Sequence, residues 1–311
     1  MVTDTMNHDE QIHSGTLFVR DIDRIDCAVF DPSIGVIGQS WYVDIEVGGQ
    51  LDQNGFVYDF SHLKKLVKAV LRNSVDHALL IPIMSTHVHF QETAQGEQWQ
   101  LKAKTRLTGL DSDWTYLCPK GAVYPVRTVK ITQEILEQEC SKQIRHRLGN
   151  SIHRVEVKLR SEVAKTGDSF FRYTHGITNH EGLCQRLFHG HRSRIEVYVA
   201  DERRRDLEQY IAHDVFGSII HIASLSQVKS GQYTPRTRPQ SSEPVTLAYE
   251  SSMGYNEATI PANRIFFVEK ETSIEWIAKE IALLLAEKTQ ELATIKVRCY
   301  EGIDKGAVAE V

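Results

Sequence analysis

The sequence predicts the same order of strands and helices twice along the 311 residues of this chain. In each half, an alternating strand leads through a short polar stretch into a helix, and a second helix and a closing strand end the half. The strands are expected at 41–47, 153–159, 191–197 and 293–299. The chain therefore predicts two α+β units of about 145 residues each, a normal domain size, at 1–163 and 168–311.

Apolar residues three and four positions apart predict the helices of both units. After the first strand, Asp59 can cap a helix that runs to Leu71, and 206–216 is its counterpart in the second unit. The helices that close the two units are expected at 132–148 and 272–288.

Two internal stretches lie outside this regular plan. Residues 86–122 are expected to form an extra hairpin, and 226–243, rich in Ser, Pro, Gln and Arg, are expected to form a mobile loop. The run Arg203-Arg204-Arg205 follows two acidic residues at the end of a predicted strand. It is interpreted as a solvated turn.

Composition restricts the class of protein. Apolar residues make up 41% of the chain and charged residues 25%, which are ordinary globular values. No apolar run is long enough to span a membrane, and a formal net charge of -5 gives no reason to expect a nucleic-acid partner. An odd number of scattered cysteines is typical of free thiols in a reducing compartment. We therefore expect a soluble cytoplasmic protein with neither a membrane nor a nucleic-acid partner.

Histidines in the second half give the sharpest chemical signal. His189 and His191 are two residues apart at the start of a predicted strand, so their side chains point to the same face. His175 ends the preceding predicted strand. Three imidazoles that converge with one position left open are the pattern of a catalytic zinc site. His180, in the loop between the strands, is a rival third ligand.

Simpler interpretations remain open. In a chain with 14 histidines, H-x-H spacing also arises by chance, and His87 and His89 have it in a stretch interpreted as surface. Cys184 lies five residues before the pair His189 and His191. Beside a divalent cation its thiol would have a lowered pKa and could act as a base or nucleophile. The alternative is that Cys184 is a small buried residue or a fourth zinc ligand.

Taken together, these motifs resemble the 6-pyruvoyl-tetrahydropterin synthase and 6-carboxytetrahydropterin synthase family. The sequence CQRLFHGH at 184–191, with His175 upstream, is similar to the family's zinc motif. The stretch GFVYDFSHLKKLVKAVLRNSVDHALL at 55–80 is similar to its second motif. The openings TQE at 132–134 and TSIE at 272–275, and VRCYEG around Glu301, resemble its third block. The likeness covers nearly the whole chain as two tandem copies.

The resemblance implies the tunnelling fold, an α+β architecture of antiparallel sheets with helices on one face, present here as two tandem units. It also implies zinc chemistry on 7,8-dihydroneopterin triphosphate. By position, His175, His189 and His191 match the zinc ligands, and Cys184 matches the catalytic thiol. Asp76 and His77 match the pair that relays a proton. Glu301 matches the glutamate that anchors the pterin ring, and Thr272 with Glu275 is expected to line the same pocket.

Departures from the family pattern are complementary between the halves. The first half has Ile37-Gly38-Gln39 in place of the H-G-H triplet, so it cannot build this zinc site. The second half lacks the Asp-His dipeptide and has GSIIHIAS at 217–224 instead. We therefore predict a composite site, with zinc and Cys184 from a second half facing Asp76 and His77 of a first half. The sequence leaves open whether both contributors belong to one chain.

The predicted activity is that of 6-carboxy-5,6,7,8-tetrahydropterin synthase, a lyase that supplies the queuosine precursor pathway. A 6-pyruvoyl-tetrahydropterin synthase or another pterin lyase of the same fold is the alternative. A further alternative, from a different class, is a non-catalytic protein of this fold that binds a pterin. A homo-oligomer is expected, either a trimer of tandem chains that resembles the family's hexamer or a dimer.

Overall fold

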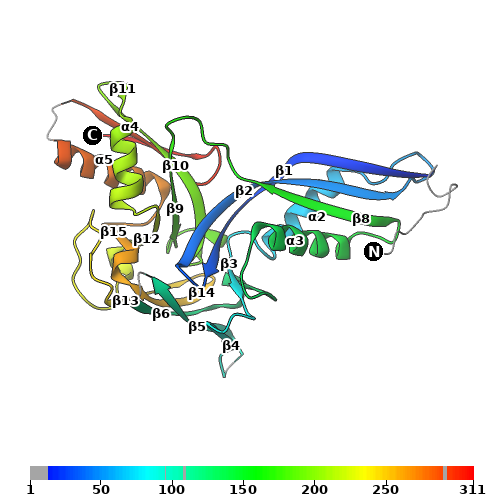
Figure 1. Cartoon of the computed structure of the whole chain (residues 1–311), viewed down its shortest axis with the longest axis horizontal. Helices are drawn as coiled ribbons and strands as arrows, with labels where there is room; N and C mark the ends of the chain where they lie inside the picture. The colour runs from blue at the N-terminus through cyan, green and yellow to red at the C-terminus, as the bar shows by residue number, and fades with distance from the viewer. Residues whose placement is uncertain (1–12, 95, 108–109, 290–292) are drawn as a thin grey trace. The chain divides into compact units, whose positions relative to one another are not determined.

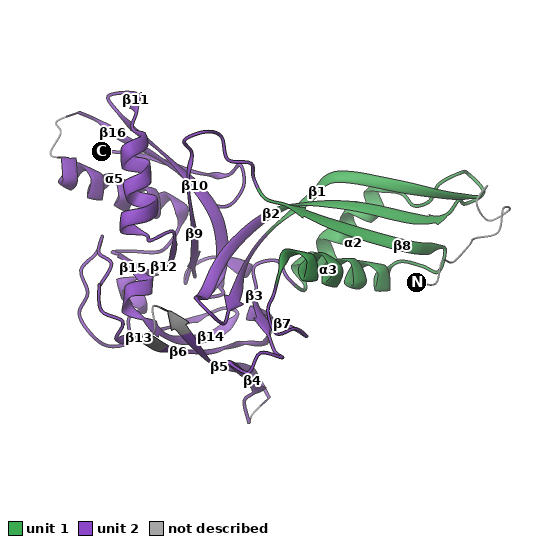
Figure 2. Cartoon of the chain, viewed as in Figure 1, with its two compact units in different colours: residues 1–25, 41–74, 132–161 green, residues 26–40, 75–131, 162–311 purple. Residues whose placement is uncertain are grey.

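The computed structural model describes residues 13–94, 96–107, 110–289 and 293–311. Its contacts divide the chain into two compact units (Figure 2). Unit 1 comprises residues 1–25, 41–74 and 132–161, and unit 2 comprises residues 26–40, 75–131 and 162–311. These contact units are not the two halves of the sequence, because strands β1 (Ser14–Asp31) and β2 (Gly35–Gln50) each pass from one unit into the other. The expected boundary between 163 and 168 stays a prediction.

Unit 1 contains two of the predicted helices, α2 (Phe60–Arg72) and α3 (Gln133–Arg147). They lie on one face of a sheet in which β2 pairs antiparallel with β8 (Ile152–Arg160) (Figure 2). Both helices begin where the sequence predicts, because the side chains of Asp59 and Thr132 accept hydrogen bonds from main-chain N–H groups of the first turn.

Unit 2 contains a larger sheet made from the second half of the chain (Figure 1). Its strand order is β15-β12-β9-β10-β16-β17, and the short β11 pairs with β10. The strands are β9 (Ser169–His175), β10 (His189–Val199), β11 (Glu202–Arg203), β12 (Ile219–Ser224), β15 (Ile265–Val268), β16 (Ile295–Tyr300) and β17 (Gly306–Glu310). Apolar side chains of α4 (Arg205–Gln209) and α5 (Ile274–Thr289) pack with β9, β10, β12 and β16 in one buried cluster.

The two halves of the chain have the same strand pairing. In the first half, β1 pairs parallel with β3 (Leu79–Pro82), and β3 pairs parallel with β7 (Val123–Val126). In the second half, β9 pairs parallel with β12, and β12 with β15. The closing strands β8 and β16 pair antiparallel with β2 and β10. This agreement confirms the α+β class and is what a tandem repeat would produce. The sheets contain parallel strand pairs as well as the antiparallel pairs that were expected.

A third sheet in unit 2 corrects one expectation. The stretch 86–122 forms β4 (Val88–Glu92), β5 (Gln98–Leu107) and β6 (Leu110–Pro119), but this hairpin is not an extra of the first half. The second half has its own hairpin, β13 (Pro244–Ser251) and β14 (Gly254–Pro261), and β14 pairs antiparallel with β6. The hairpins therefore join into one five-stranded sheet, a long-range pairing that local periodicity does not reveal.

The chain crosses itself closely where β2 meets β10 in unit 2. A Cβ atom on Gly190 would lie 2.7 Å from the Cα of Gly38, and a Cβ atom on Gly38 would overlap the carbonyl oxygen of Tyr173. Only glycine fits at both positions. The crossing brings Ile37-Gly38-Gln39 against His189-Gly190-His191, which are the two segments that occupy corresponding places in the sequence motifs.

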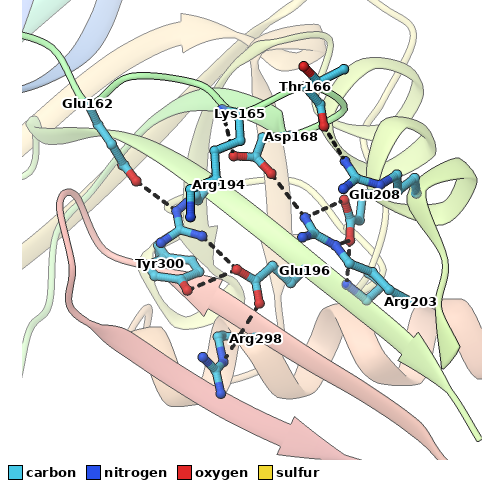
Figure 3. Close-up of polar contacts among 12 residues, drawn as sticks. Glu162, Lys165, Thr166, Asp168, Arg194, Glu196, Arg203, Glu208, Arg298 and Tyr300 are labelled. Atoms are coloured by element: carbon cyan, nitrogen blue, oxygen red, sulfur yellow. Dashed lines mark hydrogen bonds and ion pairs between the residues drawn. The ribbon is translucent and has the colours of Figure 1, made fainter. Parts of the chain in front are cut away.

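Arg203 is not a solvated turn residue, which corrects a second expectation. Its guanidinium Nε lies 2.8 Å from Oε1 of the fully buried Glu208, and its Nη2 lies 3.2 Å from Asp168 (Figure 3). Glu196 has a similar environment on β10, where Arg194 and the Tyr300 hydroxyl both donate to Oε1. A buried carboxylate needs such partners, so this network stabilises the sheet.

Two helix starts in the second half also differ in detail from expectation. The predicted helix 206–216 begins as α4 at Arg205 but continues from Tyr210 to Val215 as a π-helical turn. Helix α5 begins at Ile274, and the hydroxyl of Ser273 accepts from the N–H of Trp276. No helix among the described residues is both long and apolar enough to cross a membrane.

Candidate metal and proton-transfer site

The three predicted zinc ligands meet at one end of the β9–β10 pair in unit 2. His175 is the last residue of β9, and it lies directly opposite His189, the first residue of β10. His191 follows two residues later on the same face. All three side chains are fully buried. Antiparallel pairing thus brings together side chains that are 14 and 16 positions apart.

Glu301 completes a cluster with these histidines. One ligand atom from each of the four residues lies within 4.8 Å of every other. The Nε2 atoms of His175 and His191 are 3.3 Å apart, and Oε1 of Glu301 lies 3.7 Å from the first and 4.0 Å from the second. Glu301 directly follows β16, the neighbour of β10. Cys184 is not a member of this four-residue cluster.

Each imidazole has an acceptor behind its Nδ1 atom. That of His175 lies 2.7 Å from the carbonyl oxygen of Thr272, and that of His189 lies 3.3 Å from the carbonyl oxygen of Arg186. The Nδ1 of His191 lies 3.2 Å from the Asp26 carboxylate. An acceptor at Nδ1 holds the proton there and leaves the Nε2 lone pair free, as in metal-binding histidines.

Charge and burial agree with a metal-binding role. Burial, assisted by the neighbouring imidazoles, lowers the pKa of both His175 and His189 well below its usual range, so both are neutral near pH 7. The buried Nε2 of His189 has no hydrogen-bond partner among the described residues. Neutral imidazoles with an unpartnered nitrogen facing a carboxylate fit a zinc ion, which prefers nitrogen and oxygen ligands in this number.

Asp76 and His77 lie beside this cluster, also within unit 2. Nδ1 of His77 is 2.9 Å from Oδ2 of Asp76, and the His77 ring stacks on that of His189 with centroids 5.4 Å apart. Burial alone would lower the pKa of His77, but its contacts with Asp76 and Cys184 outweigh burial and raise the pKa to about 10. His77 also has a φ of 57°, an uncommon main-chain conformation that is frequent at functional sites.

Cys184 lies in a 3-10 turn, Leu183–Gln185, between β9 and β10, and its side chain is partly exposed. Because this thiol is one of the groups that raise the pKa of His77, it lies close to the Asp76–His77 pair. One chain therefore brings together the cluster from its second half and the Asp-His pair from its first half, all in unit 2.

Arg186 links the two groups of residues. Its guanidinium donates to the carbonyl oxygen of Asp76 at 3.1 Å, while its own carbonyl oxygen faces His189. The side chain is buried, and burial lowers its pKa below the usual range. Such a placement fixes the Asp76 main chain relative to the histidine cluster.

Other candidates from the sequence lie in different places. Thr272 is fully buried, with its hydroxyl donating to the Gly176 carbonyl and its own carbonyl behind His175. Glu275 is exposed in the first turn of α5. Their roles as substrate contacts stay predictions. His180 is exposed and is not among the four clustered residues, and His89 lies exposed on β4.

Asp26 also lies at this site and was not among the residues predicted from the sequence. Its carboxylate touches His191, and Nζ of Lys305 lies 3.1 Å from its other oxygen. Burial would raise the pKa of Asp26, but His191, Lys305 and Ser40 outweigh burial and hold it well below its usual range. Asp21, Asp23, Asp26 and Asp31 all occur in the segment RDIDRIDCAVFD. Only the last apolar run, IDCAVF, marks Asp26 as a polar residue within a buried stretch.

Comparison with known proteins gives three findings. Residues 36–166 match the family model described as 6-pyruvoyl tetrahydropterin synthase, a stretch that includes Asp76 and His77 and ends before His175. A Pyrococcus horikoshii protein, provisionally named 6-carboxy-5,6,7,8-tetrahydropterin synthase, is 23% identical over 123 residues, which are 39% of this chain and 66% of that relative. A Pyrococcus abyssi protein of the same name is 20% identical over 122 residues, with the same coverage of each chain. This chain thus spans slightly less than two thirds of the length of the relatives it matches.

Solved 6-pyruvoyl tetrahydropterin synthases are also similar to part of this chain. The Plasmodium falciparum structure is 22% identical and covers 48% of this chain and 92% of its own, with a TM-score of 0.37. A Plasmodium vivax structure is 18% identical and covers 49% and 94%, with a TM-score of 0.38.

Proposed function

We propose that this chain is a zinc-dependent pterin synthase of the 6-pyruvoyl tetrahydropterin synthase family, whose model matches residues 36–166 and which its motifs resemble. Its substrate is 7,8-dihydroneopterin triphosphate and its product is 6-carboxy-5,6,7,8-tetrahydropterin, the queuosine precursor. The observation that carries this proposal is the meeting of the His175, His189 and His191 cluster with the Asp76–His77 pair and Cys184.

His175, His189 and His191 would hold the metal. Zinc bound there supplies a Lewis acid that stabilises negative charge on a substrate oxygen. Cys184, as a thiolate, removes a proton from the substrate side chain. His77, oriented by Asp76, relays that proton, which the 2.9 Å contact between the two residues supports.

Glu301 is proposed to anchor the pterin ring. Its carboxylate is partly exposed, unlike the histidines, and Lys305 lies 3.9 Å from Oε2. A charged acceptor forms strong hydrogen bonds with the N–H donors of a pterin edge. Because Oε1 also faces the histidines, the same carboxylate is close enough to act as a fourth ligand when substrate is absent.

The catalytic site is proposed to form within one chain. The contacts of His77 with Cys184 and with the His189 ring support this, because both partners belong to the same chain. A homo-oligomer of tandem chains, a trimer or a dimer, stays part of the proposal, as does a cytoplasmic location, but neither is needed to complete the catalytic residues.

Product analysis tests the proposed activity. The zinc-loaded full chain is incubated with 7,8-dihydroneopterin triphosphate, and the pterin products are identified by mass spectrometry, with Cys184→Ala as the control. Formation of the 6-carboxy product by the wild type alone supports the proposal. Formation of the 6-pyruvoyl product would assign the alternative activity, and another pterin product would assign a different lyase. Tight binding of the pterin without turnover would identify a non-catalytic pterin-binding protein.

A further inference from the structure

Asp26 is the residue that contacts both parts of the candidate site. It lies on β1, in the first half of the sequence, and only 6% of its surface is exposed. Its main-chain N–H donates to Oδ1 of Asp76 at 3.1 Å, and its carbonyl oxygen accepts from the N–H of His77 at 2.6 Å. Its main chain therefore holds the proton-transfer pair in position.

The side chain of Asp26 points to the histidine cluster. Oδ1 lies 3.2 Å from Nδ1 of His191 and accepts a hydrogen bond of 2.5 Å from the Ser40 hydroxyl, and Nζ of Lys305 is 3.1 Å from Oδ2. These three neighbours hold the carboxylate in one orientation. The remaining two histidines of the cluster have main-chain carbonyls behind Nδ1, so among them only His191 depends on a side chain for this acceptor.

Arg172 and Gln39 form the pair that corresponds to Asp26 and His191, with the two halves of the chain exchanged. Arg172 of β9 donates through Nη1 to the side-chain oxygen of Gln39, which occupies the place of His191 in the first half. The first half thus supplies an anion, Asp26, to the imidazole of His191 in the second half. The second half supplies a cation, Arg172, to the amide of Gln39 in the first half. In each pair, the charge of the side chain therefore suits the group that it faces.

We propose that Asp26 is a positioning residue for the metal cluster, an inference that rests on the proposed zinc site. Its carboxylate oxygen, 3.2 Å from Nδ1 of His191, favours the tautomer protonated at Nδ1, keeps the Nε2 lone pair directed to the cluster and makes that nitrogen a better donor to a metal. Asp26 does not touch the substrate. Its effect on the reaction is exerted through His191 and through the main-chain contacts with Asp76 and His77.

Metal affinity tests this role separately from activity. Zn²⁺ dissociation constants of the full chain are measured by competition with a chromophoric chelator, and the Co²⁺-loaded proteins are compared by visible absorption. Asp26→Asn is expected to weaken Zn²⁺ binding by about 10- to 100-fold and to change the Co²⁺ spectrum. Asp31→Asn, on the same strand but paired with Lys130, is the matched control and is expected to leave both unchanged.

Unfolding of the metal-free proteins shows whether the variants fold. If Asp26→Asn does not fold, Ser40→Ala is the second variant: it removes one hydrogen bond to the carboxylate and is expected to weaken Zn²⁺ binding several-fold. A folded Asp26→Asn with wild-type Zn²⁺ affinity would overturn this inference but not the proposed function. If only Ser40→Ala folds, wild-type Zn²⁺ affinity in that variant would do the same. A wild-type chain that binds no Zn²⁺ would overturn the proposed function as well.

Discussion

The imidazole of His77 stacks on that of His189, with an interplanar angle of 19°. His77 comes from the half of the sequence that lacks the H-G-H triplet, and His189 comes from the half that lacks the Asp-His dipeptide. This contact brings residues of the two incomplete motif sets together within one chain. In the proposed site, each half therefore contributes the residues that the other half lacks.

Replacing Asp76 tests the proton-transfer pair. Asp76→Asn keeps a side-chain oxygen for the N–H of Asp26 but removes the carboxylate that orients His77. Turnover of 7,8-dihydroneopterin triphosphate is expected to fall by about 10²- to 10⁴-fold, the usual contribution of a positioned acid–base group. Zinc content, measured by elemental analysis, should be unchanged. An equal loss of zinc and activity would show that Asp76 acts on the metal site instead.

Zinc content distinguishes the thiol from the metal ligands. Wild-type protein should bind about one zinc per chain, because only one histidine cluster occurs among the described residues. Cys184→Ala should keep that zinc and lose turnover, whereas His189→Ala should lose both. Zinc loss in Cys184→Ala would identify the thiol as a ligand, and two zinc ions per chain would reveal a second site in the protein.

Glu301→Gln tests the pterin anchor. The amide keeps the shape of the side chain but loses the charge that strengthens hydrogen bonds to the pterin edge. Binding of an unreactive pterin to zinc-loaded protein, followed by fluorescence titration, should weaken by about 10-fold or more, consistent with the loss of one charge-assisted hydrogen bond. Glu287→Gln, exposed on α5 and outside the proposed site, is the comparison variant. Unchanged pterin binding combined with weaker zinc binding would assign Glu301 to the metal alone.

The crossing of β2 and β10 makes a stability prediction. Gly38→Ala would drive its methyl group into the main chain of Tyr173 and His191, which cannot move without disturbing the sheet. The free energy of unfolding is expected to fall by about 1–3 kcal/mol or more, the range for inserting a carbon into a packed interior. Gly149→Ala is the control, because a Cβ atom there meets no neighbour within 4 Å. Equal urea midpoints for the two variants would contradict the close approach.

Local signals explain which elements the sequence could predict. Helices α2 and α3 were predictable because Asp59 and Thr132 cap them and apolar residues repeat along one face. The π-helical turn after Gln209 was not, because the apolar spacing of Leu207, Tyr210 and Ile211 does not distinguish it from an α-helix. The pairing of β6 with β14 joins residues about 140 positions apart, and no local pattern specifies such a partner.

The same distinction applies to the site. His189 and His191 could be predicted because strand periodicity puts both on one face, and His175 because hairpin pairing brings it opposite them. Asp26 and Arg186 could not, because their roles depend on contacts between distant segments: Asp26 with His191, and Arg186 with the Asp76 carbonyl. The apolar run IDCAVF marks Asp26 only as a polar residue in a buried stretch, and nothing in the sequence around Arg186 indicates its contact with Asp76.

Cross-linking with isotope-labelled chains shows whether one chain builds the whole site. His77→Cys provides a thiol beside Cys184, while the other four cysteines are buried. Equal amounts of ¹⁴N- and ¹⁵N-labelled His77→Cys protein are mixed, treated with a short reagent that bridges two thiols, digested and analysed by mass spectrometry. If one chain builds the whole site, positions 77 and 184 are bridged and both peptides carry the same isotope. Bridged peptides of mixed isotope, or no bridge between these positions in folded protein, would contradict it.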